Sequence, residues 1–359
     1  MASSLLKSAL LGLAAAFVVD ASSPAVQNTC DQINYRKSWN VLSDDEKHEF
    51  IQAELCLMHH PPVTGLVENA TSVWDEFANI HITQGNNIHY VGHFLPWHRY
   101  YVRAHELALQ NLCNYTGAHP YWDELTDVSN ANVAASSIFD PDTGFGGNGT
   151  ASNNSCVADG PFKDIVLHMS NHHARGNNFC LSRGLSQTSL EMEVASNVEK
   201  CFGYKNYTDA WSCYNSNGPH GGGHGAVGGL MADPIDSCND PLFFLHHAYL
   251  DKLWWEWQMA DYPCRLYDMG GNNTAPDSIL DQAGLSQPGA DILDYNGDPG
   301  SVTTLHHNLW MNSIVANTTV GQIMQLNGSV VCAEYVVDES ARVYNTSVRT
   351  SGHYVDPTV

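Results

Sequence analysis

The strongest apolar pattern in this chain runs from Asp240 to about Ala260. Apolar residues recur there at helical spacing: Phe243, Leu250, Trp254 and Trp257. Asp240 and Pro241 suit a helix start, the first as a cap and the second in the first turn. His246 and His247 lie inside the run. A lone buried histidine usually bonds a carbonyl, but five further histidines here have metal-ligand spacing, so we interpret this helix as part of a metal site.

Two further amphipathic helices precede this segment. The first is predicted over residues 65–82, with one apolar face: Leu66, Ala70, Val73, Trp74, Phe77 and Ile80. The second has Pro96 in its first turn and ends near Leu112, and a shorter helix is predicted over residues 44–58. A helix end, a loop and a helix start would then carry three histidines: His81, His89 and His98.

The segment from Pro219 to Gly225 carries His220 and His224, four residues apart. A helix would place both imidazoles on one face, as a shared metal requires. Each glycine in the segment disfavours a helix by about 1 kcal/mol relative to alanine, so packing or a metal must hold it. A glycine-rich loop with incidental histidines is the alternative. The spacing and the apolar residues that follow favour the ligand interpretation.

The remaining segments have weaker patterns. Residues 129–217 are rich in Gly, Asn, Ser and Asp and predict long surface loops, pinned by disulfides, with short helices. The polar setting of three histidines there argues against another metal site: His168, His172 and His173. Residues 302–359 contain β-like runs, such as residues 329–337. We therefore predict a mainly α protein, with a four-helix bundle around a metal site, long loops and a small β-rich C-terminal part.

The first 21 residues have the features of a signal peptide, with Lys7, an apolar run and small residues around Ala21. Residues 22–359 would then form a single domain, in which no segment is long and apolar enough to span a membrane. Secretion makes the ten cysteines expected disulfide partners. Nine Asn-x-Ser/Thr sequons fit a glycosylated extracellular protein.

The charge balance narrows the possible partners. The formal net charge is −23, with only 15 Lys and Arg residues. Such acidity argues against nucleic acid or an anionic membrane surface as a partner. It suits the solubility of a secreted protein, for which we expect a monomer that acts on small molecules.

The histidines predict the metal and its chemistry. Three imidazoles per metal, without a thiolate, suit copper or zinc and leave coordination positions open. Hydrolytic zinc sites usually include a carboxylate, and this chain has no His-Glu-x-x-His motif. Ligation by nitrogen alone favours copper, which cycles between +1 and +2 and reacts with dioxygen. The sequence therefore predicts a dinuclear copper site with redox chemistry.

Two segments resemble the signatures of a known family. Residues 94–99 and 239–254 are similar to the two copper motifs of the tyrosinase, catechol oxidase and haemocyanin family, the type 3 copper proteins. Residues 121–123, Tyr-Trp-Asp, match another family segment, and residues 332–337 resemble the end of the catalytic core in short secreted fungal members. The resemblance covers nearly all of the chain after residue 21.

The resemblance implies two copper ions held by six histidines: His81, His89, His98, His220, His224 and His247. Helical spacing alone leaves His246 and His247 as alternatives, and the resemblance selects His247. His246 would then be a buried residue behind the ligands, and Asp251 would orient a ligand imidazole. Arg99 and Glu106 would belong to a structural ion-pair network.

The resemblance also implies oxidation of o-diphenols to o-quinones, with dioxygen as co-substrate and small phenols as substrates. In strong monophenolases the residue after the first ligand of the second copper is often Asn, but here it is Gly221. The family glutamate eight or nine residues before His220 is also missing, and Asp209 is the nearest acid. We therefore expect a catechol oxidase with weak monophenol hydroxylation. Four residues are expected to tune activity and rim the entrance: Gly221, Gly225, Asp233 and Pro234.

One further departure concerns the second ligand of the first copper. Many fungal members have a cysteine, cross-linked to that histidine, where this chain has Asn87, so we expect no thioether at His89. Three rival functions are a full tyrosinase, an oxygen carrier of haemocyanin type and a zinc hydrolase. The signal peptide and the short chain favour an enzyme over a carrier, and the lack of an obvious general base disfavours a hydrolase.

Overall fold

The computed structural model describes residues 24–130, 132–150, 155–173, 176–215 and 218–336. The predicted signal peptide, residues 1–21, and residues 337–359 of the predicted C-terminal β-like region lie outside the described residues. Within the described ranges, no helix is long and apolar enough to cross a membrane.

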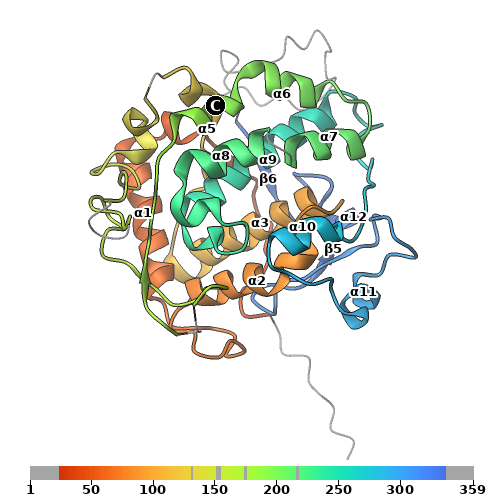
Figure 1. Ribbon diagram of the computed structural model, residues 1–359, viewed down its shortest axis with the longest axis horizontal. Helices are drawn as coiled ribbons and strands as arrows, with labels where there is room; N and C mark the ends of the chain where they lie inside the picture. Colours follow the sequence, from red (N-terminus) through yellow and green to blue (C-terminus); the bar gives the residue numbers. More distant parts are fainter. Residues whose placement is uncertain (1–23, 131, 151–154, 174–175, 216–217, 337–359) are drawn as a thin grey trace, which may run out of the picture.

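Helices account for most of the regular structure (Figure 1). The four longest helices are α1 (Asp44–His59), α2 (Val73–Ile88), α3 (Phe94–Cys113) and α9 (Leu242–Met259). The glycine-rich segment forms helix α8, Pro219–Val227, which packs beside α9. The shorter α helices are α4 (Glu124–Val128), α5 (Gln187–Leu190), α6 (Ala195–Phe202), α7 (Tyr207–Asn215), α10 (Asp277–Gln282), α11 (Ala290–Asn296) and α12 (Val320–Ile323). Short 3-10 helices are η1 (Trp39–Val41), η2 (Val133–Ala135), η3 (Ser137–Phe139), η5 (Glu191–Glu193), η6 (Gly229–Ala232) and η7 (Ser237–Asn239).

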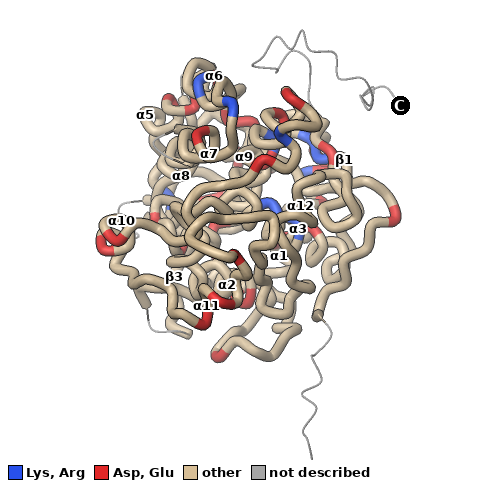
Figure 2. The backbone as a smooth tube through the Cα atoms, turned by 90° about the vertical axis from the view of Figure 1, so that its right-hand side faces the viewer, with Lys and Arg blue, Asp and Glu red and all other residues tan. Residues whose placement is uncertain are grey.

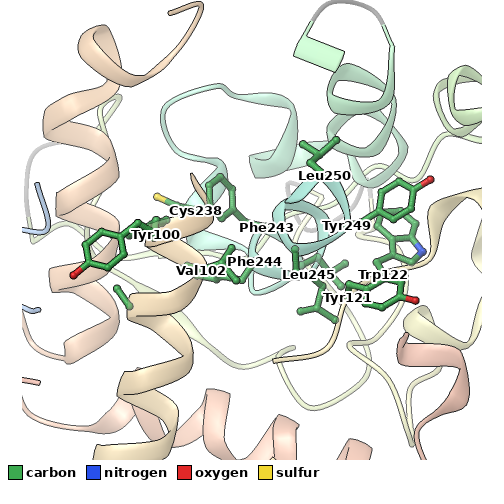
Figure 3. Packing of buried hydrophobic residues seen from close by; sticks show 14 of the residues in the cluster. Tyr100, Val102, Tyr121, Trp122, Cys238, Phe243, Phe244, Leu245, Tyr249 and Leu250 are labelled. Atoms are coloured by element: carbon green, nitrogen blue, oxygen red, sulfur yellow. The ribbon is translucent and has the colours of Figure 1, made fainter. Parts of the chain in front are cut away.

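Helices α2, α3, α8 and α9 form the bundle that the sequence predicts. Helix α3 packs against α2 and α9, and α9 also packs against α8. Residues of α3 and α9, with neighbours such as Trp122, interlock in the buried apolar core (Figure 3). Helix α9 is buried on nearly all sides, including at Phe243 and Phe244. This explains why its sequence is a long apolar run rather than a one-sided pattern. The mainly α prediction is confirmed.

The bounds of α2 differ from the predicted 65–82. Ser72 and Asp75 form a capping box, so the helix begins only at Val73. It continues to Ile88 through a polar stretch in which Gln84 bonds the carbonyl oxygen of Ile80. His81 therefore lies within the helix rather than at its end, and His89 is the C-cap residue.

Helices α3 and α9 begin close to the predicted positions. Pro96 occupies the first turn of α3, and Asn114, in the left-handed conformation, ends it. Asp240 accepts a 3.0 Å hydrogen bond from the N–H of Leu242, and its carboxylate also pairs with buried Arg183 at 2.7 Å. The N-cap residue of α9 is Pro241 rather than the predicted Asp240, but the carboxylate of Asp240 still ties the start of α9 to the long loop region.

Strands are few and short among the described residues. They form three two-stranded pairs: β1 (Asn34–Arg36) with β6 (Ala333–Tyr335) in parallel, and β2 (Val166–Leu167) with β3 (Phe179–Cys180) and β4 (Asn308–Leu309) with β5 (Thr318–Thr319), both antiparallel. Of the predicted β-like run 329–337, only β6 forms a strand within the described part. Its register pairs Asn34 with Ala333, so the two ends of the described chain meet.

Four disulfides pin the loops and ends: Cys30–Cys332, Cys56–Cys113, Cys156–Cys180 and Cys201–Cys213. The expectation that all ten cysteines pair is wrong, because Cys238 and Cys264 are free. Cys238 is buried and its thiol faces the carbonyl oxygens of Ala78 and Ile235, whereas Cys264 is exposed.

Acidic positions are spread along the chain and basic ones are few (Figure 2).

Candidate metal centre

Four helices, and the C-cap position of one of them, carry the predicted ligands. Helix α2 provides His81 and its C-cap His89, and the first turns of α3 provide His98. Helix α8 provides His220 and His224, and α9 provides the adjacent pair His246 and His247. These seven histidines form two groups, within each of which potential ligand atoms lie within 4.8 Å of one another.

Backbone carbonyls orient the first group, His81, His89 and His98. Each Nδ1–H donates to a carbonyl oxygen, at 2.9 Å to Ile235, 2.9 Å to Gly85 and 2.8 Å to Phe94, respectively. This fixes the tautomer and leaves the lone pair on Nε2. The ring centroids lie 4.8 to 5.8 Å apart. Within the described part of the chain, Nε2 of His81 and of His98 has no hydrogen-bond partner although it is buried.

The second group stands on the glycine-rich helix. His220 and His224, one turn apart, have ring centroids 4.6 Å apart, which confirms the helical spacing inferred from the sequence. The Nδ1–H of His224 donates to the carbonyl of Met231 at 2.7 Å. A Cβ on Gly223 would overlap the His246 ring and lie 2.6 Å from Glu124 Oε2. The glycines that disfavour a helix therefore let α8 approach its neighbours closely.

The two groups lie side by side. The rings of His98 and His247 stack with centroids 4.2 Å apart and an interplanar angle of 14°. His247 is 5.5 Å, between ring centroids, from both His220 and His224. Phe94 and Phe243 flank both groups: Phe94 contacts His98 and His220, and Phe243 contacts His81 and His247. The arrangement is that of two adjoining metal positions in an aromatic surrounding.

The adjacent histidines of α9 differ in their partners. His246 is fully buried and its Nδ1 lies 2.5 Å from Oε1 of buried Glu124. His247 is 1% exposed, and neither of its ring nitrogens has a hydrogen-bond partner among the described residues. Nε2 of His246 is also unpaired there, so both rings can present a lone pair to the second group.

The predicted role of Asp251 is wrong. Its carboxylate bonds Arg99, Arg36 at 3.4 Å and the hydroxyl of Tyr335 at 2.7 Å, and Nδ1 of His247 has no hydrogen-bond partner in the described residues. The reason is that the two buried arginines pair with this carboxylate. Asp251 therefore joins α9 to β1, α3 and β6 instead of orienting an imidazole.

Arg99 and Glu106 belong to this same ion-pair network, as predicted. Arg36 lies 3.0 Å from Glu106 and also reaches Asp251, so it connects the two carboxylates. Arg103 adds a second contact to Glu106 at 2.8 Å. Burial opposes ionisation of Glu106, but the two arginines hold its pKa down at about 2. The network is thus charged, and it joins α3 and α9, two of the helices that carry the histidines, to β1 and β6.

The histidines of both groups are neutral. Burial lowers the pKa of His89 to about 4 and that of His246 to about 3. Burial and neighbouring imidazoles lower the pKa of the others well below the usual value: His81, His98, His220, His224 and His247. Neutral imidazoles with unpaired, converging nitrogens fit copper ions, because a metal would satisfy buried lone pairs that nothing else in the described chain satisfies.

The predicted entrance residues lie at the edge of the site. Exposed Pro234 and His89 line a small apolar recess with Gly85, Tyr90, Ile235, Ile279, Leu280, Ala283 and Leu285. Asp233 is partly exposed and lies 2.6 Å from Nε2 of His172. Gly221 is partly exposed on α8, whereas a Cβ on Gly225 would lie 2.9 Å from Ser189 Oγ, so that position faces α5.

The three histidines of the loop region do not form a metal cluster in the described residues. His168 lies 3.4 Å from Asp75, and His172 lies at the entrance against Asp233. His172 has a raised pKa because of its hydrogen bond to Asp233. The loop region therefore contributes to the rim of the site rather than to a site of its own.

Two buried glutamates beside α8 were not predicted from the sequence. Glu124 bonds His246, and Glu193 lies against Gly222, where a Cβ would overlap its Oε1. Burial raises the pKa of both carboxyls well above the usual value. Glu124 directly follows the matched segment at residues 121–123, which was an available signal. Glu193 lies in the polar loop region, where nothing distinguishes it.

Known proteins resemble this chain in sequence and in fold. The family model described as "Common central domain of tyrosinase" matches residues 71–260. Tyrosinase-like protein phomQ1 of Diaporthe leptostromiformis is 31% identical over 327 residues, which cover 85% of this chain and 78% of that protein. Tyrosinase ustQ of Aspergillus flavus is 33% identical over 294 residues, covering 75% and 78%.

Solved structures give the same picture. A mutant polyphenol oxidase from Thermothelomyces thermophila has a TM-score of 0.68 and 26% identity, covering 85% of this chain and 89% of that one. A functional unit of octopus hemocyanin, at 18% identity and a TM-score of 0.51, shares the fold. With its two histidine groups in this fold, the chain belongs to the tyrosinase family of type 3 copper oxidoreductases.

Proposed function

We propose that this protein is a secreted dinuclear copper polyphenol oxidase that converts o-diphenols to o-quinones. Two diphenols would each lose two electrons and two protons, and one dioxygen would become two waters. The observation that supports this most is the pair of adjoining groups of neutral, buried imidazoles, joined by the stack of His98 on His247. Oxidation of phenols is consistent with the family, and the preference for o-diphenols is our own inference.

We propose six ligands: His81, His89 and His98 for one copper ion, and His220, His224 and His247 for the other. His247 is preferred to His246 because it stacks on the first group and lies equally far from both histidines of α8. The Nδ1 of His246 is already bonded to Glu124. In this arrangement His246 and Glu124 support the second group from behind.

When bound, the copper ions would supply dioxygen binding and electron acceptance. The protein contributes the rest. Backbone carbonyls hold the Nδ1–H groups, so the lone pairs of Nε2 remain available. Phe94 and Phe243 keep water away from the rings they cover, which strengthens electrostatic interactions there. The recess beside His89, with Pro234 and Ile235 in its wall, gives this edge of the site an apolar surface.

A second activity, hydroxylation of monophenols, is favoured by one observation. The sequence lacks the family glutamate shortly before His220, yet the fold brings Glu193 against Gly222, the residue after Gly221. A buried carboxyl at this position can accept a phenolic proton when it is ionised. The missing glutamate before His220 is therefore weaker support for a pure catechol oxidase, because Glu193 lies close to the same helix.

Dioxygen uptake by the copper-loaded protein tests these proposals. Uptake with a simple catechol is the predicted result, and uptake with the matching monophenol would identify a tyrosinase. Oxygen binding without turnover of either phenol would instead indicate an oxygen carrier. In the G221N variant the ratio of monophenol to diphenol activity should rise, with G225N, which faces α5, as the matched control. An unchanged ratio in G221N would contradict the proposed role of Gly221.

Secretion is supported by the predicted signal peptide, the sequons and the disulfides, which persist in oxidising compartments. The protein recovered from the medium of its producing cells should begin near residue 22. An N-terminus that retains residues 1–21 would contradict this proposal.

A further inference from the structure

A second cluster of buried ligand-type side chains lies outside the two histidine groups. It consists of Glu54 from α1, His105 from α3 and His119 from the loop before Pro120. All three are fully buried, and one potential ligand atom from each lies within 4.8 Å of the others. His105 is seven residues after His98, which places it about 10 Å further along α3 from the copper ligands.

If Glu54 is ionised, one contact of His105 in this cluster lacks a proton. The Nδ1–H of His119 donates to the carbonyl of Pro120 at 2.8 Å, so the Nε2 of His119 carries a lone pair. That lone pair lies 3.2 Å from Nδ1 of His105, and Nε2 of His105 lies 3.2 Å from Glu54 Oε2. Neutral His105 has a single ring proton. Whichever nitrogen holds it, the other nitrogen faces a lone pair unless Glu54 is protonated or a cation lies here.

The aromatic rings that cover the cluster provide neither a proton nor a charge. The ring of Phe244 stacks on His105 at 3.7 Å, and Phe50 meets His119 edge-on with centroids 5.2 Å apart. Apart from their 3.2 Å contact with each other, the carboxylate oxygens of Glu54 and Nε2 of His105 have no partner in the described part of the chain. A buried carboxylate without a partner is strongly unfavourable, so either a proton or a cation must compensate it.

We propose that Glu54, His105 and His119 form a third metal site that binds one Zn²⁺ ion, separate from the copper centre. Two imidazoles and one carboxylate are a common zinc ligand set, in contrast to the all-imidazole groups nearby. One ring nitrogen of each histidine and one oxygen of Glu54 lie within 4.8 Å of one another, so the three groups can reach a common ion after small side-chain rotations. Burial lowers the pKa of His105 to about 3, so its ring is neutral and able to ligate.

The ion would have a structural role. It would join α1, α3 and the loop at His119, and through the Phe244 ring it would support α9, which carries His246 and His247. The alternative is a protonated Glu54 that hydrogen-bonds His105, a chain of neutral groups without metal. The raised pKa that burial gives Glu54 is compatible with this alternative, so the experiment must separate the two.

Anomalous diffraction above the zinc and copper absorption edges tests the site in crystals of the whole protein grown with both metals. A zinc peak between the three side chains is the expected result, beside copper peaks at the two histidine groups. No peak at the triad would overturn the proposal, and a peak at the copper edge alone would overturn the assignment to zinc.

The E54Q variant separates metal from proton in solution. Its amide can donate to His105, so the neutral chain would survive this change with an unchanged unfolding temperature. The proposal predicts instead the loss of one bound zinc per chain, at least about a tenfold weaker zinc affinity and a lower unfolding temperature in zinc. H59Q, at an exposed histidine of α1, is the control and should keep the zinc. Equal zinc content in E54Q, H59Q and the unmodified protein would refute the site.

Discussion

The two histidine groups of this protein are oriented by different means. In the first group all three Nδ1–H groups donate to backbone carbonyls. In the second, one Nδ1 bonds the carbonyl of Met231, another bonds the side chain of Glu124, and His247 has no partner in the described residues. The first group stands on ordinary helices, and the second stands partly on α8, which contains four glycines.

This difference indicates where the site is robust and where it can be tuned. A backbone carbonyl persists in any sequence that keeps the fold, so the first group depends little on its neighbours' side chains. The second group depends on Glu124, Glu193 and the glycines that let them approach α8. We therefore expect substitutions around the second group to alter metal affinity and substrate preference, whereas those around the first group mostly alter stability.

The largest expected effect comes from removing a proposed ligand at the junction of the groups. H247Q should lose one copper ion per chain and at least about 100-fold in catechol oxidation, because a ligand contributes more than the groups that orient it. H246Q should keep two copper ions with weaker binding at the second position. Copper content by elemental analysis and oxygen uptake measure both. If H246Q loses the copper and H247Q retains it, the assignment of the two histidines is reversed.

Glycine substitutions compare the two groups directly. In G223A the new Cβ overlaps the ring of His246 and lies 2.6 Å from Glu124, neither of which can move freely. We expect a loss of about 1–3 kcal/mol in the free energy of unfolding and weaker binding of the second copper. In G85A the nearest atoms to the new Cβ belong to the Ile235 side chain, whose terminal Cδ1 makes the close contact and can rotate away. Denaturant unfolding and copper titration should show a smaller effect in G85A, and equal losses would contradict the comparison.

Replacing Glu124 removes the support of His246 without changing its shape. E124Q should weaken copper binding at the second position by about 10–100-fold and leave the first position unaffected, because this carboxylate hydrogen-bonds His246, which lies in the second group. Competition with a copper chelator, followed for each equivalent, measures the two affinities. Parallel weakening of both copper ions would mean that Glu124 supports the fold in general.

The remaining prediction concerns the pH dependence of the stability of the metal-free protein. Burial lowers the pKa of its core histidines: His81, His89, His93, His98, His105, His119, His220, His224, His246 and His247. A lowered pKa means that the unfolded chain binds more protons, so stability is retained above about pH 6.5 and falls as the pH decreases below it. Each histidine contributes up to about 1.4 kcal/mol per pH unit.

Buried acids oppose this trend in the same range. The raised pKa values of Glu54, Glu124 and Glu193 mean that these groups lose stability as the pH rises above their ordinary value of 4.5. The histidines outnumber them, so urea unfolding of the metal-free protein should show stability rising from pH 5 to pH 7. A flat or falling profile would show that the imidazoles are not buried in the neutral form.

Much of this site could be predicted from the sequence, because the ligand spacing is local. The i, i+4 pair at His220 and His224 and the apolar run around His247 each specify one helix and its histidines. The bounds of α2 were harder to predict, since its start depends on a capping box at Ser72 and its end on polar residues without helical periodicity. Periodicity also left His246 and His247 undecided, and both do lie in the second group.

Contacts between distant segments could not be read from the chain. Glu193 reaches Gly222 through the fold of the loop region, and Asp251 meets Arg36 from the opposite end of the chain. The pairing of the cysteines and the free state of Cys238 also depend on which segments meet in space. Contacts of this kind bring Glu193 to α8 and give Asp251 arginine partners instead of an imidazole. Local sequence patterns do not encode them.

The most direct test of the central claim is a titration of the metal-free protein with copper, in which bound copper and the rate of catechol-dependent oxygen uptake are measured together. Two adjoining histidine groups that act as one centre predict little activity with one copper ion per chain and full activity with two. Full activity with a single copper ion, or no activity with two, would contradict the proposed dinuclear oxidase.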